Sequence, residues 1–444
     1  MSALLFAAWM AAVPAATPIS LDEVRAEGRK NTQALQSLLD ATRSEQDVRL
    51  ARAPLLPQLS FSTSVGGTYV GRERGIVLVQ TGEGTFEQRA GETSPRDSGN
   101  FEISLSLSQI IYDRVRWKQL AQSGAAFEAA QGQAREQEDA SELEAITRFF
   151  ALYRTQATIR VLEATVQRSE EQLERALALF EAGRVGRGEE LAARVNLGND
   201  RINLLLRQAQ LAQDRGQLAV WLARPGAEPL EAQAPESLLQ PPPPAPSFEL
   251  ALAEARQRRP LLQALQQQVR AASLGQDVAS AGYWPRLLAQ GSYLRRGPEA
   301  RPVFATPRLQ NTVTGSVALQ WDLFTGLSTD AQINQARATL RTAELNLAQT
   351  GRELEAEVQR TLQLLVTQIA AAQLAAENRE TAARSLSLAE ERFKAGAGST
   401  LEVRDAQLKL TQSELTLLEN RVNVETARFG LMRAMGTLSP GELK

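Results

Sequence analysis

The chain has 444 residues and an almost even balance of charge, with 49 Lys and Arg against 51 Asp and Glu and a formal net charge of -2. This balance provides no global basic field that would attract nucleic acid or acidic substrates. The sequence contains no Cys and no His, which excludes disulfides, thiolate nucleophiles, His-based triads and zinc sites made of His or Cys. Aromatic residues make up only 5%, and Ala, Leu, Gln, Glu and Arg dominate, a composition typical of long helices.

The first residues predict a secretory signal. Residues 4–13 form an apolar run of ten, followed by Pro14, Ala15 and Ala16, which are small residues suited to signal-peptidase cleavage. The run is too short to span a bilayer as a helix. We therefore expect a signal peptide at residues 1–16, although no Lys or Arg precedes its apolar core, and the absence of Cys argues against a lipidated N-terminus.

Four segments alternate between apolar and small polar residues, which is the period of a half-buried strand. In the first half, over residues 59–65 and 101–108, odd positions are apolar except for Thr63 and even positions are Ser except for Glu102. We predict strands at about 58–70 and 101–111, with a polar loop over 72–100 between them. The second half has an equivalent pair, predicted at about 286–296 and 312–323, with a polar loop over 297–311 between them.

These strands are the only candidates for crossing a membrane, because no later run approaches the ~20 apolar residues that a spanning helix needs. Their small polar face suits a wet lumen and their apolar face suits lipid. Four strands cannot close a barrel, since small barrels need about eight, so several chains would have to contribute. A soluble, half-buried sheet is the alternative. The positions predicted to face lipid are Phe61, Ile103, Leu105, Val317 and Leu319.

Two long helices are predicted, because no Pro occurs over residues 112–180 or 332–393. At 1.5 Å per residue each would be roughly 100 Å long. Each carries a narrow apolar seam of the coiled-coil kind, which requires neighbouring helices on both sides, as in a cylinder of helices. The seam residues are Leu143, Ile146, Phe150, Tyr153 and Ala157 in the first helix, and Val358, Leu362, Leu365 and Ile369 in the second.

One sequence pattern occurs twice, at residues 180–193 and 393–406. Both copies place Phe three residues before a Gly, Glu six residues after it and Ala ten residues after it. Gly183 and Gly396 stand where a helix end requires positive φ, and Ser399 and Thr400 are available to cap the next helix. Each copy therefore predicts the tip of an antiparallel helical hairpin.

The two tips belong to a duplicated plan, in which each half runs short helices, strand, loop, strand, long helix, tip and return helix. A Pro-rich linker at residues 225–248 separates the halves. We predict a first repeat over 17–224, with a hairpin over about 112–223 and its tip at 181–188. The second repeat is predicted over 249–444, with a hairpin over about 328–436 and its tip at 394–400.

These features occur in an order that resembles the outer-membrane efflux proteins of the TolC family, over essentially the whole mature length. The resemblance rests on the two tips and on three kinds of junction between strands and helices. These are Pro57-Gln58-Leu59 with Pro285-Arg286-Leu287, Leu323-Phe324-Thr325-Gly326, and the looser Ile111-Tyr112-Asp113.

The resemblance implies a mixed α and β membrane protein. Each protomer of a homotrimer would give four strands to one β-barrel and its long helices to one periplasmic coiled-coil tunnel. It also implies a channel in the outer membrane of a Gram-negative bacterium, in contact with outer-membrane lipid. Such a channel belongs to a tripartite efflux or type I secretion system and receives small molecules or proteins from an inner-membrane pump through a periplasmic adaptor.

The resemblance further implies two sites at the tips. The adaptor would contact Gly183, Arg184, Val185, Gly186, Gly396, Ala397, Gly398 and Ser399. Glu402, Asp405 and Glu189 match the family's acidic residues at the periplasmic entrance. Glu402 and Asp405 share a face near a helix start, and threefold symmetry would gather them into a ring. The family's closing contacts use a tyrosine and an arginine where this chain has Phe393 and Gly398, so we expect a weaker latch.

Other functions find less support. The acidic entrance residues have a plainer interpretation as solvated residues at a helix start. An enzyme is not expected, because the carboxylates lie on solvated helical faces without a phosphate loop, a His base or a nucleophile elbow. No cofactor and no nucleic acid partner are expected either. The main alternative is a periplasmic coiled-coil adaptor or scaffold without a membrane barrel.

Overall fold

A computed structural model describes residues 17–72, 74–92, 95–238, 240, 243–297 and 311–438. The chain forms two compact units, and each is made from several stretches of sequence. The helical unit comprises residues 1–43, 128–268 and 344–444, and the sheet unit comprises residues 44–127 and 269–343. The predicted signal peptide at 1–16 lies outside the described residues.

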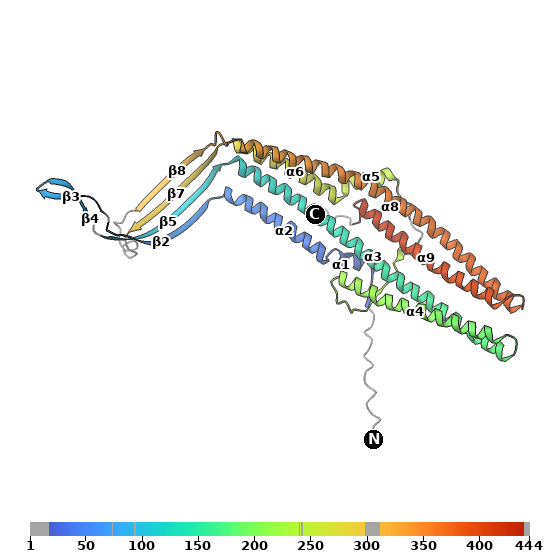
Figure 1. The fold of residues 1–444 in the computed structure, drawn as a ribbon. Coiled ribbons are helices and arrows are strands. Elements are labelled where there is room, and N and C mark those ends of the chain that lie inside the picture. The colour runs from blue at the N-terminus through green and yellow to red at the C-terminus, as the bar shows by residue number, and fades with distance from the viewer. Residues whose placement is uncertain are drawn as a thin grey trace, which may run out of the picture. The chain divides into compact units, whose positions relative to one another are not determined.

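Strands and helices follow one another in a similar order in the two halves (Figure 1). The first half contains β1 (Thr17–Ile19), α1 (Leu21–Gly28), α2 (Thr32–Arg52), the 3₁₀ turn η1 (Ala53–Leu55), β2 (Gln58–Val70), β3 (Arg74–Gly82), β4 (Thr85–Glu92), β5 (Arg96–Tyr112), α3 (Arg114–Glu181), α4 (Arg187–Trp221) and β6 (Leu230–Ala232). The second half contains η2 (Glu236–Leu238), α5 (Phe248–Arg258), α6 (Pro260–Ser280), η3 (Ala281–Tyr283), β7 (Arg286–Gly297), β8 (Asn311–Gln320), α8 (Ser328–Lys394) and α9 (Thr400–Ala434).

One antiparallel sheet joins strands from both halves in the order β2-β5-β7-β8. The halves meet where β5 pairs with β7, and β2 and β8 form the edges. Neither β2 nor β5 contains a buried residue. The sheet of one chain therefore has no dry core of its own.

The prediction of one polar loop over residues 72–100 is wrong. These residues contain the antiparallel hairpin β3–β4, whose turn includes Gly84 at a φ of 87°, and β5 already begins at Arg96. The hairpin forms because residues 76–79 are a continuous apolar run, Ile-Val-Leu-Val, opposite residues 87–90. Alternation could not predict this strand, because its apolar run is continuous.

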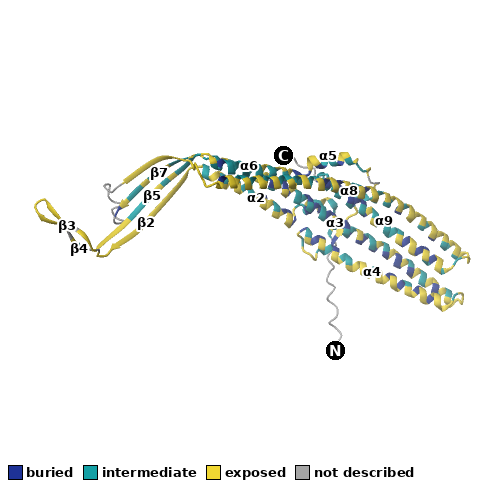
Figure 2. Cartoon of the chain, turned by 45° about the horizontal axis from the view of Figure 1, so that its top comes forward, coloured by how far each residue is buried: buried dark blue, intermediate teal, exposed yellow. Residues whose placement is uncertain are grey.

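The two long helices are confirmed, with 68 residues in α3 and 67 in α8. Buried positions of the described chain gather in the helical unit (Figure 2). Around the middle of α3, Ile146 and Phe150 are buried as the predicted seam requires, but Phe149 and Leu152 are also at most 1% exposed. The apolar stripe is therefore wider there than the narrow seam predicted. The cause is additional cover from the parallel pair β1–β6, whose Ile19 and other apolar residues join the same cluster.

The α8 seam has the predicted spacing. Val358 and Leu365 are buried, and Leu362 and Ile369 are half-buried. Such a thin stripe suits a helix that is held between other helices. None of the helices in the described part of the chain has an apolar stretch long enough, and free enough of charge, to cross a membrane.

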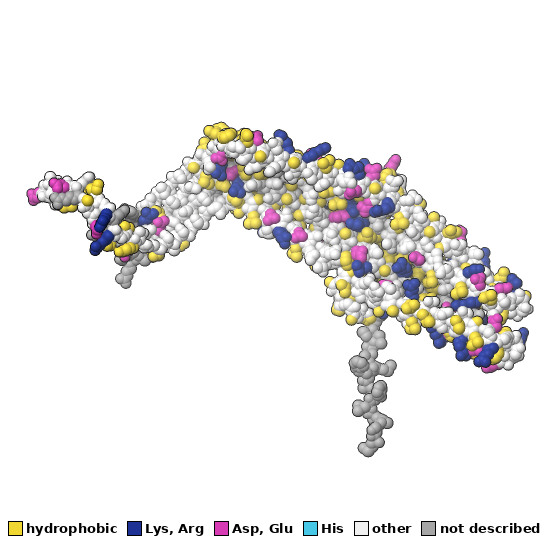
Figure 3. Space-filling model, viewed as in Figure 1, with side chains coloured by type: hydrophobic (Ala, Val, Ile, Leu, Met, Phe, Trp, Pro, Cys, Tyr) yellow, Lys and Arg dark blue, Asp and Glu magenta, His cyan; other side chains and the backbone are white. Residues whose placement is uncertain are grey.

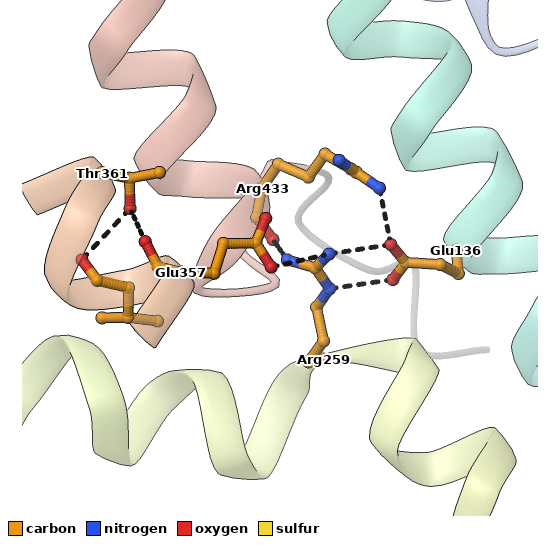
Figure 4. A network of polar contacts seen from close by, with 6 residues as sticks. Glu136, Arg259, Glu357, Thr361 and Arg433 are labelled. Carbon is orange, nitrogen blue, oxygen red and sulfur yellow. Dashed lines mark hydrogen bonds and ion pairs between the residues drawn. The ribbon is translucent and has the colours of Figure 1, made fainter. Parts of the chain in front are cut away.

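A buried network of charges joins α3, α8 and α9 to the residue that follows α5 (Figure 4). Arg259 is 3% exposed and donates through Nε and Nη2 to both carboxylate oxygens of Glu136, at 2.9 Å each. Its Nη1 donates to the carbonyl oxygen of Arg433 at 2.7 Å, and Glu357 lies 3.7 Å away. Arg433 also donates to Glu136, at 2.8 Å. A charge taken from water must be paired if it is not to destabilise the fold, and these contacts pair the guanidinium of Arg259.

Candidate functional site

The two tips have the same backbone geometry, which the sequence pattern predicted. Gly183 and Gly396 have φ values of 69° and 73°. At the first tip, the N–H of Gly183 donates to the carbonyl of Phe180 and the N–H of Arg184 to that of Leu179, both at 2.9 Å. The second tip has the same two bonds. The N–H of Gly396 donates to the carbonyl three residues before it, and the N–H of the next residue donates to the carbonyl five residues before it. This pair of bonds satisfies the carbonyls that a helix end leaves free.

The tips differ in how the next helix begins. Ser399 caps α9, because its side chain accepts a hydrogen bond from the backbone N–H of Glu402 at 3.2 Å. Gly186 stands at the corresponding position before α4 and makes no side-chain cap. A Cβ placed on Gly186 would meet nothing within 4 Å, whereas one on Gly398 would lie 3.1 Å from the backbone nitrogen of Phe393. A side chain at Gly186 would therefore have room, whereas a side chain at Gly398 would be crowded.

All eight residues predicted to contact an adaptor lie in these two turns. Six are exposed, and Val185 and Gly398 are half-buried. No side chain crowds Gly183, Gly186 or Gly396 among the residues that the structure describes. Another molecule could therefore approach the backbone closely at these points.

The three predicted acidic residues have different surroundings. Glu402 is exposed near the start of α9. Asp405 binds Lys409 at 2.6 Å, and both side chains are more than half exposed. The carboxylate of Glu189 accepts a hydrogen bond from the hydroxyl of Thr400. This hydrogen bond joins Glu189 to the other hairpin. From the sequence, Thr400 was predicted only as a possible helix cap.

A buried ion pair also joins the two hairpins, and the sequence analysis missed it. Arg404 of α9 donates to the two carboxylate oxygens of Asp200 on α4, at 3.0 and 3.1 Å. Ser169 of α3 donates to Asp200 at 2.5 Å and accepts from Arg404 at 3.1 Å. Asp200 is 7% exposed and Ser169 is 2% exposed. No local pattern marks residues 204 positions apart as partners, whereas the spacing of four between Asp405 and Lys409 is a recognisable signal.

The sheet separates apolar from hydroxyl side chains. Opposed residues of an antiparallel pair share a face, so the register places Phe61, Leu105, Tyr293 and Val313 in one row. Ile103, Val317 and Leu319 lie on the same face by alternation. All five positions predicted to face lipid are therefore on one face of the sheet.

The other face consists mainly of uncharged polar residues along its middle. One row across the four strands is Ser60, Ser106, Ser292 and Thr314. Ser292 and Thr314 share a hydrogen bond of 2.7 Å between their hydroxyls. The face of the sheet turned to the viewer in Figure 3 shows little charged or apolar colour along much of its length. Such a face suits water better than a dry core.

The chain combines a sheet that has one apolar and one hydroxyl face with two long helical hairpins. Such a sheet suits a channel in an outer membrane. The model of the outer membrane efflux protein family matches residues 27–224 and 251–437, and the chain belongs to that family. Among proteins with curated annotation, none matches the sequence.

Solved structures share this fold at low sequence identity. A structure of CusC, reported for conformational changes accompanying folding and transmembrane channel formation, has a TM-score of 0.78 and 18% identity, covering 94% of this chain and 92% of that one. The outer membrane protein VceC from Vibrio cholerae has a TM-score of 0.74 and 15% identity, covering 94% and 96%. The CmeC outer membrane channel from Campylobacter jejuni has a TM-score of 0.74 and 14% identity, covering 94% and 86%.

Family membership decides between the two interpretations of the sequence. The chain is an outer-membrane efflux channel with a periplasmic helical extension, and the alternative of a scaffold without a membrane channel is not supported. Channels of this family work with a periplasmic adaptor and an inner-membrane pump.

Proposed function

We propose that three copies of the chain form one channel. Each copy gives β2, β5, β7 and β8 to a single barrel and its long helices to one periplasmic tunnel. The observation that carries the proposal is the amphipathic sheet, whose edge strands β2 and β8 have no further partner among the described residues. Lipid does not tolerate open sheet edges, and four strands are about half of what a small barrel needs.

The proposed organisation of the chain follows the duplicated plan. It comprises a signal peptide at 1–16, repeats over 17–224 and 249–444, and a linker at 225–248. The family model supports this division, because it matches in two separate ranges that leave out residues 225–250. The sheet supports it as well, since each half contributes one adjacent pair of strands.

The adaptor is proposed to dock at the tips. The eight residues named above lie in two exposed turns of similar backbone geometry, and their glycines allow close approach. Glu402, Asp405 and Glu189 are proposed to line the periplasmic entrance. The charge of Asp405 is partly offset by Lys409, so Glu402 carries the larger part of the proposed negative field.

The proposed activity is the passage of small molecules or proteins from pump and adaptor to the outside. It requires no catalytic residue, metal or cofactor. The uncharged row of hydroxyls on the sheet would line the lumen and the apolar row would contact lipid.

The experiment is fractionation followed by bilayer recording. The full chain, expressed in a Gram-negative host, is expected in the outer membrane fraction as an oligomer that unheated gel electrophoresis preserves and boiling dissociates. Purified in detergent, it is expected to open conducting pores in planar bilayers, and chemical cross-linking should stop at three copies. A chain that stays soluble without detergent and conducts no current would refute the channel.

A further inference from the structure

Aromatic side chains gather at the end of the sheet where its strands pass into the helices. Of the four tryptophans in the described part of the chain, Trp117, Trp284 and Trp321 lie here, and each is more than half exposed. All three belong to the sheet unit, whereas Trp221 belongs to the helical unit. Apolar side chains are prominent at this corner, between β8 and α8 (Figure 3). Exposed rings in such number indicate a surface that another molecule covers.

Direct contacts join these rings into one cluster. The guanidinium carbon of Arg114 lies 4.4 Å from the centroid of the Trp284 ring. The carbonyl of the neighbouring Tyr283 accepts a hydrogen bond of 3.0 Å from Nε1 of Trp321. Trp117 follows Arg114 by three residues on α3, so the two side chains share a helix face. These five residues, from both halves of the sequence, form one surface, which we call the junction cluster.

Arg114 is the cation of the junction cluster, and its charge is not neutralised by a bonded partner. Its side chain is half-buried, and among the described residues its guanidinium makes no ion pair and no hydrogen bond. The nearby carboxylates are engaged elsewhere. Asp113 accepts from a backbone N–H at the start of α3 at 2.9 Å, and Asp330 accepts from a tyrosine hydroxyl at 2.8 Å. Asp277 binds Lys118 at 2.7 Å. The N–H groups of Arg114 are therefore left for an external acceptor.

The junction cluster continues the apolar face of the sheet. Trp321 follows Leu319 by two positions, and Leu319 pairs with Leu287 on β7. Both leucines lie on the face that holds Leu105. The chain is an outer-membrane channel with a periplasmic helical extension, so in the proposed barrel this end of the sheet lies at the periplasmic leaflet. Continuity with the face that contacts lipid identifies a lipid as the occupant, and aromatic rings are typical of that boundary.

We propose that the junction cluster binds the phosphate group of a phospholipid in the periplasmic leaflet of the outer membrane. The planar guanidinium of Arg114 can donate to phosphate oxygens while its face stays on an aromatic ring. The acyl chains lie along Leu287 and Leu319. The exposed Asp322 beside Trp321 offsets positive charge, so the site recognises the phosphate itself and not the net charge of the lipid.

This site rests on the proposed barrel, because lipid reaches the junction cluster only when the apolar face is turned outward. It goes beyond the channel function, since it fixes the height of the chain in the membrane. The two proposals can fail separately. Pores in planar bilayers report the channel, and binding of lipid to the purified protein reports the site.

The test is quenching of tryptophan fluorescence by lipids with brominated acyl chains, because bromine quenches only rings that it approaches closely. The full chain, purified in neutral detergent, carries Trp221→Phe, which leaves the three tryptophans of the junction cluster once the proposed signal peptide is removed. Phosphatidylethanolamine and diacylglycerol with the same brominated chains are compared, since neither has a net charge. The phospholipid should quench at about tenfold lower concentration, because only its phosphate accepts charge-assisted hydrogen bonds.

Two matched variants identify the group that recognises the phosphate. Arg114→Gln should raise the phospholipid concentration needed for half of the quenching by about tenfold and leave that of diacylglycerol unchanged. Arg116→Gln is the control, because Arg116 is exposed and binds only Gln119, at 3.2 Å, among the described residues. Side chains two positions apart on a helix do not face each other, so this variant should quench as the parent chain does. Both variants should still form pores.

Equal quenching by the two lipids would overturn the proposal, because the junction cluster would then be an apolar surface without recognition of phosphate. An equal loss in both arginine variants would also overturn it, since positive charge in general would then attract the lipid. Absence of quenching by either lipid, in protein that forms pores, would place the cluster away from lipid. The comparison of the two lipids can be repeated on the unmodified chain, so it does not depend on the folding of any variant.

Discussion

At the scale of single residues, the helical unit depends on a few buried charges that have little freedom to change. Arg259 is the clearest case, because it contacts Glu136, the carbonyl of Arg433 and Glu357 while only 3% of its side chain is exposed. Its partners come from three different helices. A change at this one position therefore affects the packing of segments from both halves of the sequence.

We expect Arg259→Met to lower the free energy of unfolding by about 3 to 5 kcal/mol, because removal of one partner leaves a buried carboxylate short of compensation. Equilibrium unfolding in urea, followed by far-UV circular dichroism, measures the change. The matched control is Arg256→Met, which removes an ion pair at 3.2 Å whose arginine side chain is 62% exposed. That change should cost about 0 to 1 kcal/mol. Similar losses for both variants would show that the Arg259 network is worth no more than a surface pair.

Glu138 on α3 provides a prediction for pH. Burial raises the pKa of its carboxyl above the ordinary value of 4.5, against the opposing effect of Arg29 and Arg135. The folded state therefore holds this proton more tightly than the unfolded state. The resulting contribution to stability is complete below the unfolded pKa and is lost as pH rises through the higher folded pKa.

Glu138→Gln should therefore stabilise the protein at pH 7, where the native carboxyl is held in an unfavourable charged form. The gain should shrink as pH falls below the unfolded pKa of 4.5, because the Glu138 carboxyl then increasingly holds its proton in both the folded and the unfolded state. Thermal unfolding of both proteins between pH 4 and pH 7 checks this. A difference that does not change with pH would mean that the two side chains differ in packing and not in ionisation.

At the scale of elements, the sheet allows its two faces to be compared at neighbouring positions of one strand. Leu105 and Ser106 are adjacent in β5 and lie on opposite faces. In the proposed channel, Leu105→Arg places a charge against lipid and should cost about 2 to 4 kcal/mol near the midplane, whereas Ser106→Arg should be tolerated in the wet lumen. Thermal dissociation of the oligomer in lipid vesicles measures both. Equal sensitivity would indicate a sheet buried on both faces.

The open turn at Gly186 allows a test of adaptor docking without backbone strain. Its φ is -75°, and a Cβ there meets nothing within 4 Å, so Gly186→Trp leaves the fold intact. The indole should obstruct a docking helix and reduce cross-linking to the adaptor by about tenfold, equivalent to about 1.4 kcal/mol of lost binding. Gly198→Trp, at another open glycine farther along α4, is the control. Unchanged cross-linking with Gly186→Trp would place the docking surface elsewhere.

Local patterns in the sequence predicted the long helices, the four strands of the main sheet and the two tips. The absence of Pro predicted α3 and α8, alternation predicted β2, β5, β7 and β8, and the duplicated glycine turns predicted both tips. Where a strand lacks alternation, as in β3, the same reasoning failed. The short pair β1–β6 was missed because each strand has only three residues, and its partner lies more than two hundred positions away.

The candidate site was predicted less completely than the fold. The glycines and acids of the tips follow from spacing, but the bonds that join the hairpins do not. Glu189 and Thr400 are 211 positions apart, and Asp200 and Arg404 are 204 apart. Tertiary packing alone brings these pairs together.

At the scale of the whole molecule, the proposed threefold assembly changes the meaning of small features of one chain. An exposed carboxylate on a single chain attracts cations only weakly in water. Three copies around one axis add their electrostatic fields within a confined opening and attract cations more strongly. Glu402 would be present three times at the entrance. Lys409 would oppose Asp405 three times as well, because the pair of 2.6 Å is repeated in every copy.

The entrance should therefore bind multivalent cations, which should block the channel. Removal of negative charge at the entrance should weaken this block, and removal of positive charge should strengthen it. In planar bilayers at 0.1 M salt, a trivalent cation added from the periplasmic side should block the native channel. Glu402→Ala with Asp405→Ala should abolish the block, and Lys409→Ala should strengthen it by releasing Asp405. Raising the salt to 1 M should weaken every block, since the screening length falls from about 10 Å to about 3 Å. A block that persists in the double variant would show that these acids are ordinary solvated residues at a helix start.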